Sequence, residues 1–465
     1  MIPHAERDSL VIPPSTFFLM RTSKKTLAAA LATAFVAGSF EVDDLVERGY
    51  GVIGKKPRWM QPLAERLHAA FPWDMRPRRA SVERFLLFDY GFHRAYRRSK
   101  LTVASRIGSS PVMNQGVVAS GWKAIRPLTT PAELADWLDV PLRQLDWFAG
   151  VGPYKRVPTE MKLQHYRYRV LKKVDGNVRL LEAPKARLKR MQQKILTEIL
   201  NHVPPHATCH GFRRGRSITT FAKPHQGQAV VVKLDLRDFF PSIRAAQIHA
   251  LFLYLGYPEP VAHLLTGLCT TSAPETVWRE IGASPRNNLT QEQIRRYARP
   301  HLPQGAPTSP ALANLCAYRL DYRLSGLALA AGATYTRYAD DLAFSGDAVF
   351  RRAAQRFVVH ATAIVLEEGY QVHHRKTRVM RQSVRQKIAG LVVNQQANVP
   401  RKDFDRLKAT LTNCVRHGPE SQNRADHANF RLHLRGRIAF VESINQKRGE
   451  QLRSIFAQIT WPQSA

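Results

Sequence analysis

The sequence predicts an α+β protein with a helical N-terminal extension, and three observations support this class. Apolar residues recur at helical spacing before residue 150, for example in segments 59–71 and 81–88. From about residue 163 onward, runs rich in β-forming residues alternate with turns and helices. The chain is helical and basic again after about residue 400. Its 465 residues allow about two to four domains, and 44% hydrophobic residues exclude wholesale disorder.

The extension, residues 1–150, is expected to be mostly helical. Thr130 before Pro131 is a good helix start, and Gly150 is a stop for the helix that follows. The apolar run 27–40 follows three basic residues and imitates a secretory signal. It is too short to span a bilayer and begins well after Met1, so a buried helix is favoured. Segment 107–121, rich in Gly, Ser and Val, is the expected linker.

The charge balance indicates a polyanionic partner. Lys and Arg number 70 against 36 Asp and Glu, which gives a formal net charge of +34. Most of this excess lies after residue 150, so nucleic acid is the leading partner class and an anionic membrane the second. Four cysteines without a CxxC pair make no disulfide framework, which indicates a cytoplasmic protein with reduced thiols.

The β-rich part begins with an expected hairpin around Asp175-Gly176, followed by a helix over 185–200. A strand is expected within 228–240, and a strand–turn–strand unit over 333–346. The polar segment 272–300 is interpreted as an insertion between these elements.

Three acidic residues stand in otherwise apolar β-like segments. Asp235 follows VVVKL, and Asp340 and Asp341 lie between RYA and LAF. A carboxylate at the end of a buried strand is costly unless it is paired or bound to a cation, and the adjacent acids repel each other. Hard oxygen ligands favour Mg²⁺, and two such ions suit phosphoryl transfer. YADD taken alone is more often a hairpin turn than a metal site.

The sequence motifs that contain and follow these acids resemble those of the palm of reverse transcriptases. DLRDFF, LPQGAPTSP, YADD and HHRKT follow one another in the order of that family at residues 235–240, 302–310, 338–341 and 373–377. The upstream block around Lys172, Lys173 and Arg179 resembles its fingers. The resemblance covers about residues 160–465 and is highly specific when the motifs are taken together.

Within that family the chain is most similar to the retron class, through GFRRGRSI, FAKPH and RQKIAGLVVN. The class commonly carries an N-A-x-x-H element, in which Phe221 here replaces Asn, and a V-T-G element, which appears here as residues 388–390, Ile-Ala-Gly. These differences concern the subclass and not the polymerase chemistry. The resemblance implies a right-hand polymerase fold, with fingers and palm over residues 151–384 and a helical thumb over 385–465.

Several roles follow from the resemblance, position by position. The metal ligands would be Asp235, Asp340, Asp341 and the backbone carbonyl of Leu236. Two Mg²⁺ ions per active site are implied, with Mn²⁺ as a substitute. Lys376 would protonate pyrophosphate, or simply contact phosphate. Phe240 would lie under the sugar and exclude a 2′-OH. The expected nucleotide-binding residues are Lys172, Arg179, Asp238, Phe239, Phe240, Gln304 and Gly305. The expected nucleic-acid-binding residues are Arg213, Arg216, His225, Arg401, Lys402 and Arg435.

Three further assignments stay open at this point. Lys172 could instead be a solvated side chain on the hairpin face, because that is the default for an exposed lysine. Asp238 could instead hold the local backbone, because Asp commonly bonds neighbouring N–H groups. His225 could be structural instead of contacting the RNA backbone.

The implied function is RNA-directed DNA synthesis on a structured noncoding RNA, with RNA-linked single-stranded DNA as product and dNTPs as substrates. A retron effector protein and a role in antiphage defence are implied by the family alone. One alternative is a reverse transcriptase of another kind, intron-derived or from another defence system. A second is a catalytically silent RNA-binding scaffold, which the intact aspartates disfavour. A membrane-surface protein is disfavoured because no strong amphipathic anchor is present.

Overall fold

The computed structural model divides the chain into two compact units, residues 1–112 and 113–465, and each is described here by itself. The described residues are 22–36, 40–71, 77, 79–99, 101–103, 125–151, 163–172, 178–282 and 291–461. The expected linker 107–121 and the expected turn at Asp175-Gly176 lie outside them.

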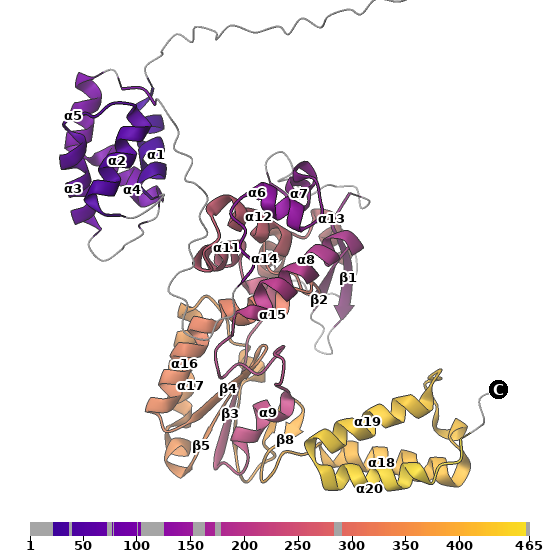
Figure 1. Ribbon diagram of the computed structural model, residues 1–465. Helices are drawn as coiled ribbons and strands as arrows, with labels where there is room; N and C mark the ends of the chain where they lie inside the picture. Colours follow the sequence, from indigo (N-terminus) through magenta and orange to yellow (C-terminus); the bar gives the residue numbers. More distant parts are fainter. Residues whose placement is uncertain are drawn as a thin grey trace, which may run out of the picture. The chain divides into compact units, whose positions relative to one another are not determined.

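The first unit is a small helical domain (Figure 1). Its described helices are α1 (Lys24–Phe35), α2 (Val42–Ile53), α3 (Met60–Ala70), α4 (Arg79–Phe88) and α5 (Tyr90–Arg98). The expected buried helix is confirmed as α1, because Leu27, Leu31 and Phe35 are fully buried in the core of this unit. In the part of the chain that the structure describes, no helix combines the length and the apolar character needed to cross a membrane.

Helices α6 (Pro131–Trp137) and α7 (Leu142–Ala149) belong to the second unit, so the expected extension over residues 1–150 is divided. The hydroxyl of Thr130 caps α6, and Gly150 ends α7 with a φ of 61°. Both helices bury their apolar sides against α12 (Glu259–Cys269), where a Cβ on Gly267 would meet the Ala149 carbonyl at 2.1 Å. This close packing joins residues 125–150 to the larger core.

A hairpin and the helices around it form one end of the second unit. Strand β1 (Tyr166–Lys172) pairs antiparallel with β2 (Val178–Pro184), and α8 (Ala186–Glu198) follows. Helices α13 (Glu275–Gly282) and α14 (Gln291–Ala298) bring Trp278 and Tyr297 against Leu180 of β2. The described parts of the expected insertion 272–300 are therefore packed onto the hairpin, because their aromatic side chains complete a small core there.

The centre of the second unit is a four-stranded antiparallel sheet of order β4-β5-β3-β6 (Figure 1). Its strands are β3 (Val230–Asp235), β4 (Thr334–Tyr338), β5 (Asp341–Gly346) and β6 (Arg378–Arg381). Strand β3 is buried on both faces: Val230 and Val232 join one hydrophobic core and Val231 joins another. This explains why Val230, Val231 and Val232 are apolar in succession, without alternation.

Helices cover the sheet and connect its strands. The helices between β3 and β4 include α10 (Phe239–Ser242), α11 (Ala245–Tyr254), α15 (Ser309–Cys316) and α16 (Tyr318–Ala330). Helix α17 (Ala348–Glu367) follows β5 and packs against β3 and β5 through an aromatic cluster of Phe344, Phe350 and Phe357. Helix α9 (Ile218–Ala222) contacts β4, with Phe221 in the second core.

The C-terminal helices complete the second core. A short ladder of β7 (Lys387–Ile388) and β8 (Leu391–Val392) precedes α18 (Arg401–His417), α19 (Phe430–Ile444) and α20 (Gln446–Ala457). Their buried residues, such as Leu411 and Leu434, share one apolar cluster with Val231 and Ala343 of the sheet.

A buried ion pair holds the end of β4. The guanidinium of Arg337 donates to both carboxylate oxygens of Asp321 at 2.8 and 2.7 Å, and both side chains are fully buried. Arg337 also donates to the Asn314 side chain and to the Ala339 carbonyl, at 3.1 and 3.2 Å. Burial acts to lower the pKa of Arg337, but attraction to Asp321 outweighs it and raises that pKa. The turn after β4 is thereby tied to α15 and α16.

We expect a deletion of residues 1–112 to leave the melting temperature of the second unit nearly unchanged, because the cut follows the division between the units. A deletion of residues 1–150 should lower the free energy of unfolding by on the order of 5 kcal/mol, since it removes buried side chains such as Leu134 and Leu145 from the larger core. Thermal unfolding of the two purified proteins checks this. Equal melting temperatures would contradict the packing of α6 and α7.

Replacement of Asp321 by Asn should destabilise the second unit by about 3–5 kcal/mol, because it leaves Arg337 as a buried charge without a counterion. The matched control is Glu367→Gln, which removes an exposed partner of Arg323 on α16. That change should cost less than about 1 kcal/mol. Urea unfolding measures the loss of stability in both variants. Similar losses for the two would contradict the larger contribution of the buried pair.

Candidate active site

The turn between β4 and β5 places two of the expected carboxylates. Tyr338 and Asp341 are register partners, so Ala339 and Asp340 form the tip of the hairpin, and Ala339 has a φ of 55°. Asp341 is in turn the register partner of Asp235 at the end of β3. The backbone N–H of Leu236 donates to the Asp340 carbonyl at 2.8 Å. The structure therefore brings the three predicted aspartates to one edge of the sheet.

The three carboxylates lie close enough together to repel one another, as expected. Burial raises the pKa of Asp340, and repulsion from Asp341 and Asp235 raises it further. Burial also raises the pKa of Asp341, although Lys233 opposes this rise through an ion pair of 2.7 Å. Lys376 reaches Asp235 from the other side, with its Nζ 3.0 and 3.3 Å from the two carboxylate oxygens. Two ammonium groups thus partly balance the three acids.

The donor chemistry fits a hard divalent cation. Ionised carboxylates only accept, and three of them that repel one another at one sheet edge gain from a cation between them. Among the described residues, however, no group of three or more His, Cys, Asp or Glu side chains is arranged as a ready metal cage. Asp341 and Asp235 are instead each ion-paired with a lysine, Lys233 and Lys376.

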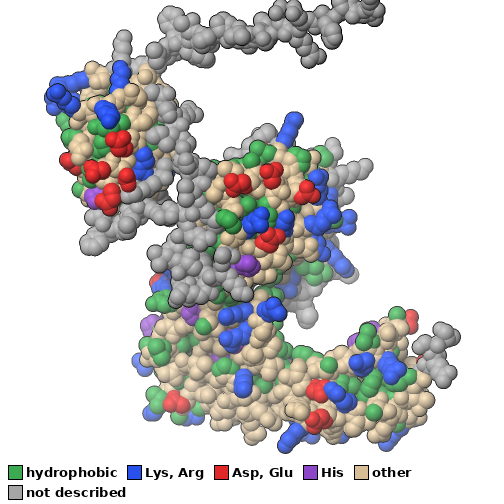
Figure 2. Space-filling model, viewed as in Figure 1, with side chains coloured by type: hydrophobic (Ala, Val, Ile, Leu, Met, Phe, Trp, Pro, Cys, Tyr) green, Lys and Arg blue, Asp and Glu red, His purple; other side chains and the backbone are tan. Residues whose placement is uncertain are grey.

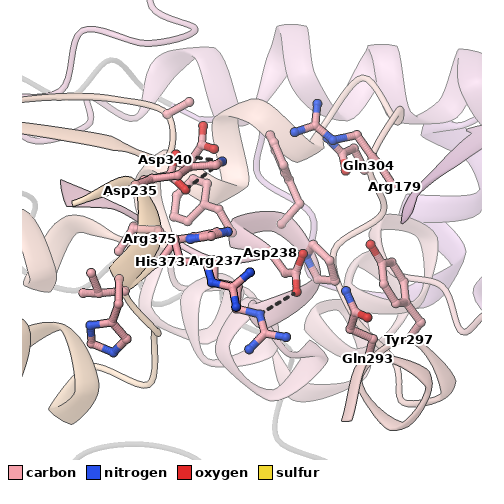
Figure 3. Close-up of a pocket in the computed structure, with 18 of the residues that line it drawn as sticks. Arg179, Asp235, Arg237, Asp238, Gln293, Tyr297, Gln304, Asp340, His373 and Arg375 are labelled. Atoms are coloured by element: carbon pink, nitrogen blue, oxygen red, sulfur yellow. Dashed lines mark hydrogen bonds and ion pairs between the residues drawn. The ribbon is translucent and has the colours of Figure 1, made fainter. Parts of the chain in front are cut away.

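A cavity of about 550 Å³ opens beside this edge. Figure 3 shows Asp235 and Asp340 on one side of it and Arg179 and Gln304 on the other. Its wall includes most of the predicted catalytic, metal-binding and nucleotide-binding residues: Arg179, Asp235, Leu236, Asp238, Phe239, Phe240, Gln304, Asp340 and Lys376. Asp341 and Gly305 do not line it, and the side chain of Lys172 lies outside the described residues.

A buried glutamate fixes the loop that carries Gln304. The backbone N–H of Glu182 on β2 donates to the Gln304 carbonyl at 2.9 Å. Its fully buried carboxylate lies 3.0 Å from the His301 ring and accepts from the Gln304 N–H at 3.3 Å. Gly305 has a φ of 135°, and a Cβ there would come within 3.0 Å of the Glu182 carbonyl. Gly305 is therefore a packing residue, which lets the loop lie against the strand that also carries Arg179.

The DLRDFF segment supplies both lining and packing. Asp238 is ion-paired with Arg296 at 3.5 Å and with Arg237 at 3.7 Å, whereas its side chain makes no cap hydrogen bond at the start of α10, so the expected hold on the local backbone is not seen there. Phe239 is buried against Tyr370, with ring centroids 5.7 Å apart. Phe240 is only half buried and faces the cavity. Of the three, Phe240 is thus the side chain placed to touch a ligand.

One predicted nucleic-acid contact is wrong. His225 is fully buried, and its two ring nitrogens lie 2.6 and 2.7 Å from the hydroxyls of Ser345 and Thr336. Burial lowers the pKa of His225 to about 3, so the ring carries no charge for a phosphate. The structural alternative for His225 is the one the structure supports. The other predicted contacts are exposed or half-buried, namely Arg213, Arg216, Arg401, Lys402 and Arg435.

Sequence reasoning missed several residues of the cavity wall. Gln293 and Tyr297 come from α14, within the segment interpreted as an insertion, although their i, i+4 spacing is that of one helix face. Phe212 comes from GFRRGRSI; its ring is 6.1 Å from that of Phe240 and it is 50% exposed with a φ of 55°. Lys233, which does not line the cavity but pairs with Asp341, was also missed because a lysine inside a strand is usually a solvated side chain.

The surface around these elements is basic. Figure 2 shows Lys and Arg side chains spread over the visible face of the second unit, with Asp and Glu side chains fewer among them. Arg401 and Lys402 begin α18 and Arg435 lies on α19, all three exposed. Such a surface attracts a phosphate backbone through counterion release.

Comparison with known proteins agrees with this geometry. Residues 171–394 match the family model described as reverse transcriptase (RNA-dependent DNA polymerase). Retron Mx65 reverse transcriptase of Myxococcus xanthus is 41% identical over 296 residues, 63% of this chain and 64% of that protein. Retron Mx162 reverse transcriptase of the same organism is 36% identical over 347 residues, 72% of this chain and 67% of that protein. Retron Ec86 reverse transcriptase of Escherichia coli is 29% identical over 299 residues, 63% of this chain and 82% of that protein.

The chain thus spans about two thirds of the length of the two Myxococcus relatives. Reverse transcriptases generally use divalent metal ions, which agrees with the acidic sheet edge. The expected α+β polymerase fold and the retron resemblance are both confirmed by these matches. Identity of this level over most of the sequence shows that the chain belongs to the retron reverse transcriptases, a family of RNA-directed DNA polymerases.

Proposed function

We propose that this chain copies a structured noncoding RNA into single-stranded DNA that stays linked to the RNA. The observation that carries the proposal is the convergence of Asp235, Asp340 and Asp341 at one sheet edge, across a cavity from Arg179 and Gln304. By analogy with the family, synthesis starts from the 2′-hydroxyl of an internal guanosine. The substrates are then dNTPs, and the template and primer belong to one folded RNA.

Mg²⁺ is the metal we propose for this site, as two ions held by Asp235, Asp340, Asp341 and the Leu236 carbonyl, with Mn²⁺ as a substitute. When bound, such ions activate the attacking hydroxyl and neutralise the charge of the leaving pyrophosphate. Lys233 and Lys376 already offset part of the carboxylate charge through their ion pairs with Asp341 and Asp235. Their ion pairs have to loosen for the carboxylates to turn toward a cation.

The remaining residues of the cavity bind and orient the nucleotide. The Arg179 guanidinium is suited to the triphosphate because its planar fork matches phosphate oxygens, and the Gln304 loop is held at a fixed distance from it by Glu182. Phe240 is placed beneath the sugar, where its ring excludes a 2′-hydroxyl. Lys376 Nζ, with its side chain 47% exposed, is free to carry a proton to the leaving pyrophosphate once its pair with Asp235 loosens.

The partners follow from the same proposal. The template RNA and its DNA product lie along the basic surfaces that include Arg213, Arg216, Arg401 and Arg435. An effector protein and a role in antiphage defence are proposed from the family relationship alone. A cytoplasmic location is proposed because the four cysteines are free thiols.

Asp340→Asn should reduce dNTP incorporation by on the order of a thousandfold, because it removes one negative metal ligand without changing the shape of the side chain. RNA binding should survive. Primer extension and a filter-binding assay measure the two properties on the same preparation. The matched control is Asp347→Asn, which keeps a good N-cap for α17 outside the cavity and should be fully active. Incorporation at the wild-type rate by the Asp340 variant would reject the metal assignment.

Phe240→Ala should let ribonucleotides in, because the half-buried ring that faces the cavity no longer blocks a 2′-hydroxyl. The ratio of kcat/KM for dNTP over rNTP should fall by about tenfold or more. Steady-state incorporation of each nucleotide gives that ratio. Tyr322→Ala, an exposed aromatic on α16 outside the cavity wall, is the control and should keep the wild-type ratio. Unchanged discrimination would remove Phe240 from this role.

A further inference from the structure

Helix α5 of the first unit presents a charged face that the polymerase chemistry does not use. Its exposed side chains are Tyr90, His93, Arg94, Arg97 and Arg98, and no acidic residue is among them. On a helical projection these five positions form one continuous face. Phe92 and Ala95 lie on the opposite side and are buried in the core of the unit. The apolar side of α5 is therefore already occupied, and its basic side is left open.

Two aromatic rings stand beside this basic face. Phe88, the last residue of α4, is 84% exposed, and Tyr90, the first residue of α5, is 76% exposed. Between them, Asp89 caps α5 and binds Arg66 through two hydrogen bonds of 2.8 and 2.9 Å. The backbone that carries both rings is thus held firmly. Large aromatic side chains that are exposed on a rigid turn are typical of a surface that meets a partner.

The acidic residues of α2 and the basic residues of α5 lie on separate helices of this unit. Four acidic residues lie on α2 and its N-cap, Glu41, Asp43, Asp44 and Glu47. At α5, by contrast, Asp89 is the nearest acid in sequence and its side chain is only 7% exposed because it is paired with Arg66. Lys24 adds a further cation at this face, with its Nζ 2.9 Å from the His93 ring. In Figure 2, Lys and Arg side chains of this unit gather mainly toward one end of the visible face.

We propose that Phe88, Tyr90, Arg94, Arg97 and Arg98, named here the α5 patch, form a second RNA-binding site. The arginines are suited to phosphate oxygens, and the two rings are suited to stack on unpaired bases. A helix of nine residues is about 13 Å long, enough for a few nucleotides. The patch thus fits a loop or single-stranded segment of a folded RNA. This inference rests on the proposed function, because it makes the α5 patch a contact for the noncoding RNA away from the catalytic cavity.

A membrane surface fits the same charge less well. Interfacial helices insert a broad apolar face between the lipid headgroups, with the cations at its border. The apolar face of α5 is instead buried through Phe92 and Ala95, and only two exposed rings remain. Alternation of exposed aromatic and cationic side chains is what single-stranded nucleic acid requires.

The experiment uses the full-length protein and a fluorescent RNA hairpin with a uridine-rich loop as the probe. Arg94→Gln with Arg97→Gln should lower the slope of log K against log salt concentration by about 1.4, which corresponds to two lost phosphate contacts on a single strand. Tyr90→Ala should weaken binding by about tenfold, because one stacked base loses its platform. Ultraviolet crosslinking of the wild-type complex should label a peptide that contains residues 88–98.

The matched control is Lys55→Gln with Arg58→Gln, two exposed cations of the same unit between α2 and α3. It should leave affinity, salt slope and crosslinks unchanged. An equal loss in this control, or no loss in the α5 variants together with no crosslink in residues 88–98, overturns the proposal. Binding of the wild type to phosphatidylserine vesicles that the α5 changes abolish, with RNA binding intact, would assign the patch to membranes and also overturn it.

Primer extension on a pre-annealed generic template separates this inference from the proposed function. The α5 variants should extend such a primer at the wild-type rate, because none of the substituted residues lines the catalytic cavity. Failure of the wild-type protein to extend would defeat the proposed polymerase function, whereas the salt slope and the crosslinks test the α5 patch alone.

Discussion

The buried pair of Arg337 and Asp321 is the interaction on which the geometry of the site depends. A buried guanidinium needs hydrogen-bond acceptors for its N–H groups, and here Asp321, Asn314 and the Ala339 carbonyl supply them. The backbone of Arg337 also bonds to residues 208 and 210, so the segment that leads to Phe212 is tied to the same strand. A Cβ on Gly211 would meet the Ala339 N at 2.5 Å, which shows how tightly this segment packs on the hairpin tip. The hairpin tip next to Asp340 is thus held in place by the residues packed against it.

The second constraint is electrostatic. Burial and repulsion from neighbouring carboxylates raise the pKa of Asp340 and of Asp341, and the ion pair with Lys233 opposes the rise at Asp341. The same carboxylates keep the chemistry of hard oxygen ligands, which suits a divalent cation.

The distribution of function over the chain follows from the packing of its helices. Helices α6 and α7 complete the core of the polymerase unit, whereas α1–α5 have a core of their own. A unit with its own core can carry an independent surface, and α5 leaves its basic side open. This is the physical basis for assigning a separate RNA contact to the first unit and the chemistry to the second.

Much of this organisation could be predicted from local patterns. The buried run of β3, the helix start at Thr130, the stop at Gly150 and the strand–turn–strand over 333–346 all depend on residues close in sequence. The motif order was enough to name the three aspartates and about half of the cavity wall, because each motif keeps its own local geometry.

Contacts between distant segments could not be predicted in this way. The burial of His225, the pairing of Lys233 with Asp341, the place of α14 in the cavity wall and the union of α6 and α7 with the larger core depend on which elements meet in space. The sequence by itself determined the elements, the basic character and the identity of the carboxylates. Only the tertiary structure decided which charges are neutralised and which side chains reach the cavity, because burial and pairing are properties of packed neighbours and not of a single stretch of chain.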